Sequence, residues 1–396
     1  MTRSEPASTL PPLTPEEAAH SARAQARIRE RIYAAGGSID FETFMELALY
    51  APGLGYYSAG STKLGAAGDF VTAPELSPLF GRCLARQCAQ ILGALGEESE
   101  ILEFGAGSGR LAAVVLESLA ALGRAPRRYQ ILEVSADLRE RQRERLGRLP
   151  AALAERVVWL ERLPRSAIRG VILANEVLDA LPCRRFVIHA AGPRELGVGL
   201  ADDGQLVEVE REPDARLAAA LAQLLAALSA PLPLGYRSEL CLRVAPWITS
   251  AAESLAEGVM LLTDYGLPRA QYYHPERGTG TLRAHFRHRA HEEPLARAAV
   301  QDITAWVDFT RVAEAAVAAQ LDVVGFATQA GFLLGTGIEA LVAEAGELSE
   351  RVRRAGEARR LLLPGEMGEA FKALALARAW QSPLAGFAVQ DLRASL

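Results

Sequence analysis

Lysine is nearly absent from this chain. Only Lys63 and Lys372 occur among its 396 residues, so arginine carries almost all of the positive charge. Acidic residues outnumber basic ones, 48 to 43, and the formal net charge is −5. Domains that bind nucleic acid usually carry a basic excess. We therefore expect no nucleic-acid partner.

Cysteine is scarce as well, and long hydrophobic runs are missing. The cysteines follow no disulfide-rich or zinc-binding spacing, which indicates reduced, buried thiols at Cys83, Cys88, Cys183 and Cys241. No stretch of about 18 uncharged apolar residues is present, which argues against a membrane-spanning helix. The opening segment carries acids early and has no hydrophobic region, which argues against a signal or transit peptide. The expected location is the cytoplasm.

The most informative segment that is present reads ILEFGAGSGRL, at 101–111. Its apolar residues predict a short buried strand, and the Ala- and Leu-rich run at 111–122 predicts a helix. Between them, three glycines allow a sharp turn and the close approach of a ligand to the backbone: Gly105, Gly107 and Gly109. The free N–H groups at the start of the helix would face that ligand. A turn without a ligand is the alternative.

Two details of this segment bear on the ligand. Arg110 stands where the dinucleotide-binding fingerprint has glycine or alanine, and Glu103 precedes the first glycine by two positions. The combination resembles the first motif of class I S-adenosylmethionine methyltransferases. We expect Glu103 and Ala106 to belong to the cofactor site together with the glycines. An NAD-dependent oxidoreductase is the alternative, because NAD also binds at such a turn.

The next expected strand, at 129–134, ends near Glu133. A carboxylate at the tip of that strand can accept hydrogen bonds from both ribose hydroxyls of a nucleoside. We assign Glu133 and its neighbour Val134 to the cofactor site. A solvated glutamate at the strand end is the alternative, and Glu133 does not distinguish the two cofactors because NAD uses the same carboxylate.

The fourth core strand, at 169–175, leads into an acidic loop. Ligands of an open α/β sheet bind beyond the carboxyl ends of its strands, which places Asn175, Glu176 and Asp179 over the cofactor pocket. Glu176 and Asp179 are three residues apart and would face the same way on a helical turn. They could hold a guanidinium between them or take a proton during methyl transfer. Alternatively, Glu176 binds the cofactor or caps the following turn.

The segment at 68–75 lies ahead of the expected sheet. Asp69 and Glu75 flank a Thr-Ala-Pro turn that could start the next helix. On the residues alone, helix capping by Thr72 or Ser77 is the favoured interpretation.

Histidine and aromatic residues gather further along the chain. Three histidines recur every third residue in an arginine-rich segment: His285, His288 and His291. We expect a loop over the active site there and no metal site, because a strand or loop would not present all three to one ion. Trp306 and Phe309 form either an aromatic wall of the site or part of the core.

Strand and helix alternate through the centre of the chain, which predicts a doubly wound parallel sheet. Strands are expected at 100–104, 129–134, 156–160, 169–175, 258–264, 322–326 and 385–389. Hairpin patterns followed by an Ala/Leu helix indicate an insertion at about 184–240. The expected fold class is α/β, a Rossmann-like methyltransferase core with a helical N-terminal part and this insertion.

Three regions are expected along the chain. Residues 1–15 form a disordered leader, 16–98 a helical cap with a cofactor-covering loop, and 99–396 the core. Thr14 and Pro15 mark the start of the first helix as its N-cap and first position. Apolar helices after residue 310 leave room for a homodimer interface.

Taken together, these segments resemble the MidA family of S-adenosylmethionine-dependent methyltransferases. The resemblance covers about 68–310 and is carried by GDFVTAPELSPLFG (68–81), ILEFGAGSGRLA (101–112), YQILEVSADLRERQ (129–142), VILANEVLDALPCRRF (171–186), LLTDYG (261–266), YYHPERGTGTLRAHFRHRAH (272–291) and DITAWVDFT (302–310). It implies methyl transfer from S-adenosylmethionine to an arginine side chain of a protein. A subunit of respiratory complex I is one candidate acceptor.

The resemblance also implies roles for individual residues. Those that would contact the cofactor are Gly105, Gly107 and Gly109 at its methionine end, Glu133 at its ribose, and Asp69, Phe70 and Thr72 closing over it. Glu176 and Asp179 would form the acidic pair that grips a guanidinium. The rival functions are a small-molecule methyltransferase and an assembly chaperone that binds S-adenosylmethionine without catalysis.

Overall fold

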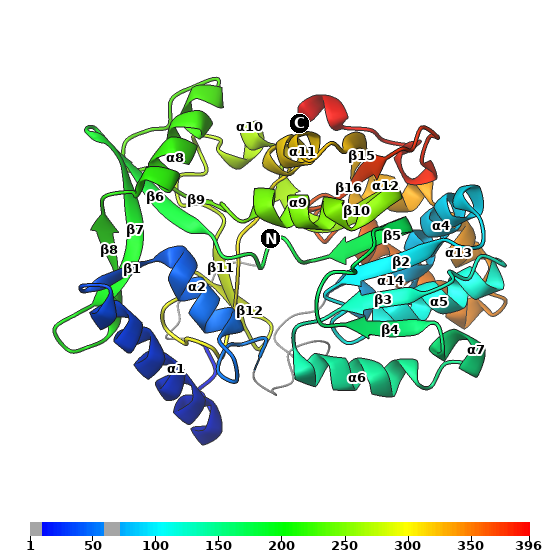
Figure 1. The fold of residues 1–396 in the computed structure, drawn as a ribbon, viewed down its shortest axis with the longest axis horizontal. Helices are drawn as coiled ribbons and strands as arrows, with labels where there is room; N and C mark the ends of the chain where they lie inside the picture. The colour runs from blue at the N-terminus through cyan, green and yellow to red at the C-terminus, as the bar shows by residue number, and fades with distance from the viewer. Residues whose placement is uncertain (1–9, 59–71) are drawn as a thin grey trace.

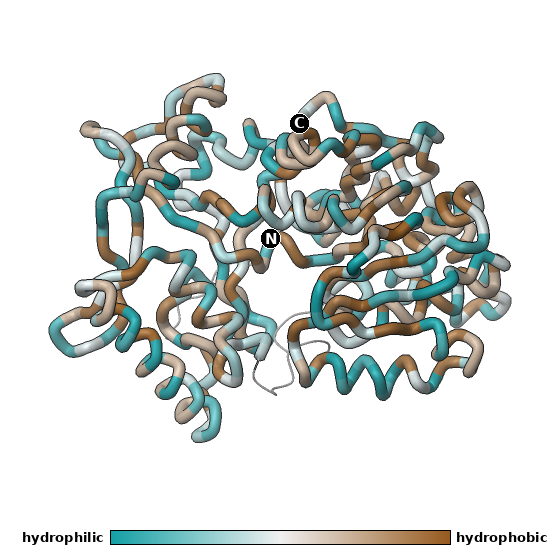
Figure 2. Tube along the Cα trace, in the orientation of Figure 1, coloured by the Kyte–Doolittle hydropathy of each residue, from teal (hydrophilic) through white to brown (hydrophobic). Residues whose placement is uncertain are grey.

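The computed structural model describes residues 10–58 and 72–396, which form two lobes side by side (Figure 1). In this part of the chain, the larger lobe holds an eight-stranded sheet and the smaller lobe a five-stranded sheet. Hydrophobic residues concentrate in the strands and inner helices of the larger lobe, whereas α6 (Ala136–Leu146) at its edge is mainly hydrophilic (Figure 2). None of the described helices is long and apolar enough to cross a membrane.

The central sheet has the strand order β4-β3-β2-β5-β10-β16-β15. Its strands are β2 (Glu100–Phe104), β3 (Tyr129–Leu132), β4 (Val157–Leu160), β5 (Ile168–Asn175), β10 (Leu255–Leu267), β15 (Asp322–Thr328) and β16 (Phe371–Arg378), and the short β14 (Val307–Asp308) pairs with β10. The first five strands in this order run parallel, whereas β16 is antiparallel to both of its neighbours. The carboxyl ends of the parallel strands therefore meet at one edge, where open α/β sheets bind their ligands.

Neighbouring residues of the central strands pack against two different layers of helices. In β2, Ile101 joins the hydrophobic cluster of one layer and Leu102 joins that of the other. The first layer contains α4 (Pro78–Leu95), α5 (Arg110–Ala121), α12 (Gln329–Gly335), α13 (Ile338–Ala343) and α14 (Leu348–Leu362), and the second contains α9 (Val244–Glu253) and α11 (Phe309–Ala318). Both faces of the sheet are covered, as its near-continuous apolar strands require.

The smaller lobe unites the N-terminal helices with the segment expected as an insertion. Its sheet has the order β1-β7-β6-β9, and β8 pairs with β7. The elements are α1 (Pro15–Ala34), β1 (Ser38–Asp40), α2 (Phe41–Tyr50), β6 (Arg184–His189), β7 (Gly192–Leu200), β8 (Leu206–Arg211), α8 (Ala215–Ala227) and β9 (Arg237–Leu240). Because β1 pairs with β7, the two parts share one sheet although they are far apart in the sequence.

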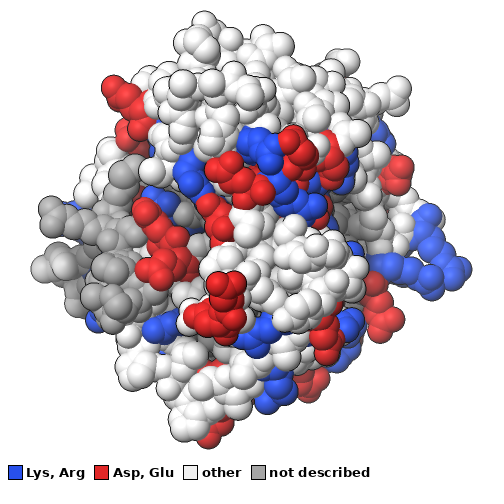
Figure 3. All heavy atoms as spheres, turned by 90° about the vertical axis from the view of Figure 1, so that its left-hand side faces the viewer, with Lys and Arg blue, Asp and Glu red and all other residues white. Residues whose placement is uncertain are grey.

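Charged side chains of both signs lie interspersed on the outer face of this lobe (Figure 3). Arg185 pairs with Glu208 across a distance of 2.5 Å between nitrogen and oxygen. Such partly exposed pairs contribute about 0–1 kcal/mol each. A different pair, Arg184 with Glu195, is buried between β6 and β7 and also has a separation of 2.5 Å.

The remaining elements are short. A third sheet has the order β12-β11-β13, with strands β11 (Arg283–Phe286), β12 (Arg289–His291) and β13 (Asp302–Thr304). The short helices are α3 (Ala73–Leu76), α7 (Ala151–Ala154) and α10 (Arg269–Tyr272), and 3₁₀ turns lie at Ala385–Phe387 and Arg393–Ser395. The expectation of a loop at the three histidines is therefore wrong in part, since His285 lies in β11 and His291 in β12.

Most of the expected elements are confirmed, with small differences in their bounds. The α/β fold class, the helix start at Thr14 and Pro15, and six of the seven expected strands agree with the structure. The strand expected at 385–389 is wrong, because a 3₁₀ turn occupies it, and the strand that completes the sheet is β16. Its sequence, FKALALAR, resembles a helix in composition, and its place between β10 and β15 overrides that preference.

Two glycines in adjacent strands are needed for neighbouring strands of the central sheet to pair. Gly170 of β5 pairs with Glu100 of β2 on one side and with Gly258 of β10 on the other. A Cβ at Gly170 would lie 1.8 Å from the carbonyl oxygen of Glu100. We expect Gly170→Ala to lower the free energy of unfolding by about 3 kcal/mol, measured by urea denaturation.

Gly356→Ala is the matched control for this substitution. Gly356 is exposed in α14, and a Cβ there would meet nothing within 4 Å. Because glycine is a poor helix former, the control should raise the free energy of unfolding by roughly 0.5–1 kcal/mol. Equal effects of the two substitutions would contradict the close approach at Gly170.

Candidate functional site

A cavity of about 840 Å³ lies at the carboxyl edge of the central sheet, with walls from both lobes. Its volume is in the range of small-molecule and cofactor sites, roughly 300–1,000 Å³. Of the residues predicted from the sequence, those lining it are Thr72, Glu103, Gly105, Ala106, Gly107, Glu133, Val134, Asn175 and Glu176. Gly109 and Asp179 are not among the described residues that line it. Asp69 and Phe70 lie outside the described residues.

The turn between β2 and α5 depends on glycines with left-handed backbone. The φ angles are +63° at Gly105, +53° at Gly107 and +77° at Gly109, values that residues with a Cβ rarely adopt. Gly105 donates its N–H to the carbonyl of Leu132 at 3.0 Å, which ties the turn to β3. A Cβ at Gly109 would lie 3.3 Å from the Cα of Gln142, so this glycine allows α6 to approach the turn.

Glu133 follows β3, and its carboxylate is held by donors of the protein. The N–H of Ser135 donates to Oε1 at 2.9 Å, and the amide of Gln142 donates to Oε2 at 3.1 Å. Burial raises the pKa of the Glu133 carboxyl, and these hydrogen bonds act in the opposite direction. Glu133 is 5% exposed, so the alternative of a solvated glutamate is wrong. Val134 beside it is 75% exposed and offers apolar surface to the cavity.

Glu103 lies in β2 just before the glycine turn, and its side chain is buried. The hydroxyl of Tyr129 donates to Oε2 of Glu103 at 2.9 Å. Burial raises the pKa of Glu103 to about 7, although the bond from Tyr129 opposes that shift. Glu103 is thus a second carboxyl group of the cavity with a raised pKa.

A turn with unusual backbone presents Glu176 to the cavity after β5. Glu176 has φ +52°, and such left-handed conformations of side-chain-bearing residues cost on the order of 1–3 kcal/mol and cluster at functional sites. The Thr263 hydroxyl donates to Asn175 Oδ1 at 2.8 Å, and the Asn175 amide donates to Glu176 Oε1 at 3.3 Å. Burial and the nearby charge of Asp179 raise the pKa of Glu176 to about 8.

Asp179 is buried next to the cavity wall. Burial raises its pKa to about 6, while a hydrogen bond with Tyr265 acts in the opposite direction. Its Oδ1 has no hydrogen-bond partner among the described residues. The backbone N–H groups of Leu178 and Asp179 donate to Asp264 Oδ2 at 2.9 and 3.2 Å, which fixes the turn. The two acids are therefore close in space, but Glu176 faces the cavity and Asp179 does not line it.

The short helix α3 braces the glycine turn from the other side. Ser108 donates its hydroxyl to Glu75, and Arg110 lies 3.5 Å from Glu75 Oε2. Thr72 makes no capping hydrogen bond within the described residues and instead lines the cavity. The capping alternative holds for Ser77, whose hydroxyl accepts the N–H of Leu79 at 3.1 Å.

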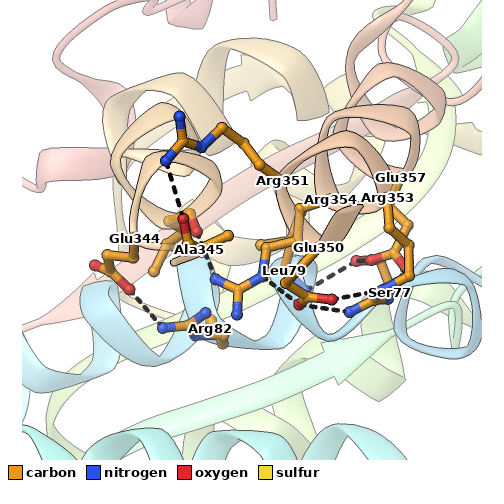
Figure 4. Close-up of polar contacts among 11 residues, drawn as sticks. Ser77, Leu79, Arg82, Glu344, Ala345, Glu350, Arg351, Arg353, Arg354 and Glu357 are labelled. Atoms are coloured by element: carbon orange, nitrogen blue, oxygen red, sulfur yellow. Dashed lines mark hydrogen bonds and ion pairs between the residues drawn. The ribbon is translucent and has the colours of Figure 1, made fainter. Parts of the chain in front are cut away.

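Helix α14 anchors this brace at Ser77 (Figure 4). The Ser77 hydroxyl donates to Glu357 Oε2 at 2.6 Å, and Arg353 links Glu357 to Glu350. Arg354 donates to Glu350 at 2.7 Å and to the carbonyl of Leu341 at 2.9 Å. Ser77 separates α3 from α4, so the network fixes the end of the helix that carries Glu75.

The opposite wall of the cavity comes from α2 and the residues after it. Tyr50 and Tyr57 stack with ring centroids 5.5 Å apart. Tyr50 donates its hydroxyl to the carbonyl of Ala180 at 2.9 Å, close to the acidic turn. Arg243 donates to Glu42 of α2 at 2.6 Å. These wall residues are far from the glycine turn in sequence, and no motif marks them.

The aromatic and histidine candidates lie elsewhere. Phe309 is fully buried and packs on Phe326 with ring centroids 5.2 Å apart, so the core alternative is correct for Phe309. Trp306 is half-buried, contacts Tyr265 and packs at the side of another hydrophobic cluster, and it does not line the cavity either. His291 is fully buried. Across residues 10–58 and 72–396, no group of three or more His, Cys, Asp or Glu could hold a metal ion.

Comparison with known proteins identifies the family. The profile of a family of S-adenosyl-L-methionine-dependent methyltransferases matches residues 83–327. The chain belongs to this family. A Burkholderia thailandensis protein, whose crystal structure is bound to S-adenosyl-homocysteine, is 42% identical with a TM-score of 0.92, and the match covers 98% of this chain and 100% of that one.

Curated relatives are more distant. The zebrafish (Danio rerio) protein arginine methyltransferase NDUFAF7, mitochondrial, is 29% identical over 85% of this methyltransferase and 83% of the relative. The human (Homo sapiens) protein of the same name is 27% identical over 86% and 80%. The fold, cofactor class and family expected from the sequence are confirmed by these matches.

The expected cytoplasmic location is contradicted by the same comparison, because the curated relatives are mitochondrial proteins. Free cysteines are compatible with any reducing compartment, so they do not separate the cytoplasm from the others.

The raised pKa of Glu176 predicts a pH dependence of stability. In the unfolded chain this carboxyl titrates near 4.5, and in the folded protein near 8. Between these values the folded state holds a proton that the unfolded chain has released, so the free energy of unfolding falls as pH rises. We expect Glu176→Gln to make that decline shallower, measured by urea denaturation from about pH 5 to about pH 9. Parallel curves for variant and wild type would contradict a raised pKa.

Proposed function

We propose that this methyltransferase acts on an arginine side chain of a protein. The observation that carries the proposal is Glu176, a carboxyl group held in a costly turn at the wall of the same cavity as the glycine turn and Glu133. A guanidinium is a permanent cation with several N–H donors, and a carboxylate is its natural partner. The names of the curated relatives support the same acceptor.

The cofactor end of the proposed site is formed by the loops after β2 and β3. S-adenosyl-L-methionine supplies an electrophilic methyl group on a sulfonium sulfur. In the proposal, the backbone at Gly105 and Gly107 allows its close approach, because neither residue adds a Cβ to the cavity. Glu133 accepts hydrogen bonds from the ribose hydroxyls, and Val134 provides an apolar contact. Glu103 lies beside the turn.

At the acceptor end, Glu176 binds the guanidinium and orients one nitrogen toward the cofactor. It takes the proton that this nitrogen loses as the nitrogen bonds to the methyl carbon, whose bond to the sulfonium sulfur breaks and leaves S-adenosylhomocysteine. Its pKa of about 8 in the free protein makes it a good proton acceptor, and the incoming cation favours its ionised form. Asp179 contributes through Glu176, because its charge helps to raise that pKa. Asn175 holds one carboxylate oxygen in place.

The first test is calorimetric titration with S-adenosylhomocysteine, with NAD as the control ligand. We expect micromolar binding of the former alone. Gly107→Val should weaken binding by more than about tenfold, because valine strongly disfavours φ +53°. Binding of NAD, or unchanged binding by the Gly107 variant, would contradict the assignment of the cofactor site.

The second test separates the cofactor from the acceptor. Glu176→Gln should bind S-adenosylhomocysteine within about twofold of wild type and lose methyl transfer to arginine-centred peptides by about 100-fold or more. Matched lysine-centred peptides and free metabolites serve as acceptor controls, with transfer followed by mass spectrometry. Loss of both properties would make Glu176 a cofactor ligand, and methylation of metabolites alone would replace the protein substrate by a small molecule.

A further inference from the structure

Gln142 of α6 is a fully buried glutamine that touches three parts of the candidate cofactor site. Its amide nitrogen donates to the carbonyl of Gly107 at 2.9 Å and to Glu133 Oε2 at 3.1 Å. Its amide oxygen accepts the indole N–H of Trp159 from β4 at 3.0 Å. One side chain therefore joins the glycine turn, the carboxylate after β3 and the neighbouring strand.

The orientation of this amide follows from its partners. An indole N–H can only donate, whereas a backbone carbonyl and a carboxylate oxygen accept. The amide oxygen must therefore face Trp159, and the nitrogen must face Gly107 and Glu133. Glutamate at this position would place an acceptor oxygen against the carbonyl of Gly107 and the carboxylate of Glu133, which are acceptors themselves. Methionine would leave all three partners without a hydrogen bond. The site thus requires an amide.

We propose that Gln142 is a positioning residue for the cofactor, which holds the carboxylate of Glu133 in the arrangement that receives the ribose and fixes the carbonyl of Gly107 in the glycine turn beside it. This inference rests on the proposed role of Glu133. A carboxylate offers about four acceptor positions, so the donors from Ser135 and Gln142 leave capacity for a ligand hydroxyl.

The packing of α6 provides independent support. A Cβ at Gly109 would lie 3.3 Å from the Cα and the Cγ of Gln142, closer than side chains normally approach. Gly109 does not line the cavity, yet its missing side chain allows Gln142 to reach the turn. The third glycine of the motif thus serves the contact between Gln142 and the site.

Glu133 interacts electrostatically with several titratable residues around it. Arg139 of α6 lowers the pKa of Glu133, and the charge of Glu133 in turn raises the pKa values of Glu103 in β2 and Tyr50 in α2. Gln142 is a neutral donor that favours the ionised carboxylate. Without it, Glu133 should take up a proton at higher pH and lose its acceptor capacity there.

The test measures S-adenosylhomocysteine affinity by calorimetry in the full-length chain. Gln142→Met should weaken binding by about tenfold, and the loss of affinity on the acid side should move to higher pH than in wild type. Gln87→Met is the matched control, because Gln87 is also fully buried and bonded through both amide atoms but lies away from the cavity. This control should cost stability and leave affinity within about twofold.

A double-mutant cycle distinguishes positioning from a general structural role. If Gln142 acts through Glu133, then adding Gln142→Met to Glu133→Gln should change affinity by less than about twofold. Trp159→Phe keeps the glutamine and removes the N–H that orients it, and it should weaken binding several-fold. This variant replaces Gln142→Met in the test if Gln142→Met does not fold.

The outcomes separate the two proposals. Failure of the wild type to bind S-adenosylhomocysteine would overturn the proposed function. If the wild type binds S-adenosylhomocysteine and the Gln142→Met and Trp159→Phe variants bind it with the same affinity as the wild type, the inference about Gln142 is overturned and the proposed function is not. A full tenfold loss in the Glu133→Gln background, or an unshifted pH profile, would also overturn it.

Discussion

The site depends on the parallel arrangement of β3, β2, β5 and β10, whose carboxyl ends meet at one edge of the central sheet. Three of these strands each deliver a group there: Glu133 after β3, the glycine turn after β2 and Glu176 after β5. The paired glycines of β5 and β10 allow these strands to approach. Without this register, residues far apart in sequence would not share one cavity.

Burial of several carboxyl groups along that edge is the main cost of the arrangement. The pKa values of Glu103, Glu133, Glu176 and Asp179 are all raised, and burial is the largest cause for each. Hydrogen bonds from Tyr129, Ser135, Gln142 and Asn175 offset part of that cost. The balance leaves carboxyl groups that can accept a hydrogen bond or a proton from a ligand, and this capacity is what the proposed function uses.

The parts of the site that follow a strand directly could be predicted from the sequence. The glycine turn, Glu133 and Glu176 each come after an apolar strand, and the rule that ligands bind at strand ends places them together. Asp179 was expected to face the ligand with Glu176, but the turn held by Asp264 leaves it outside the lining. A three-residue spacing does not fix orientation where the backbone is not helical.

Contacts between distant elements could not be predicted. Gln142 lies within a segment that carries the family resemblance, yet its role depends on how α6 packs against Gly109. Glu75 reaches the glycine turn because α14 fixes Ser77. For β16, an Ala- and Leu-rich sequence favours a helix, and only its place in the sheet makes it a strand. Tertiary context decides all three cases.

The central claim is that the loops after β2 and β3 hold one nucleoside while Glu176 remains free for the acceptor. A crystal structure of the protein with S-adenosylhomocysteine tests this claim most directly. We predict that the ribose hydroxyls lie within hydrogen-bond distance of Glu133 and that the amino-acid end of the ligand lies at Gly105 and Gly107. Neither the ribose nor the adenine should contact Glu176. A ribose bound at Glu176, or a ligand away from the glycine turn, would contradict the account.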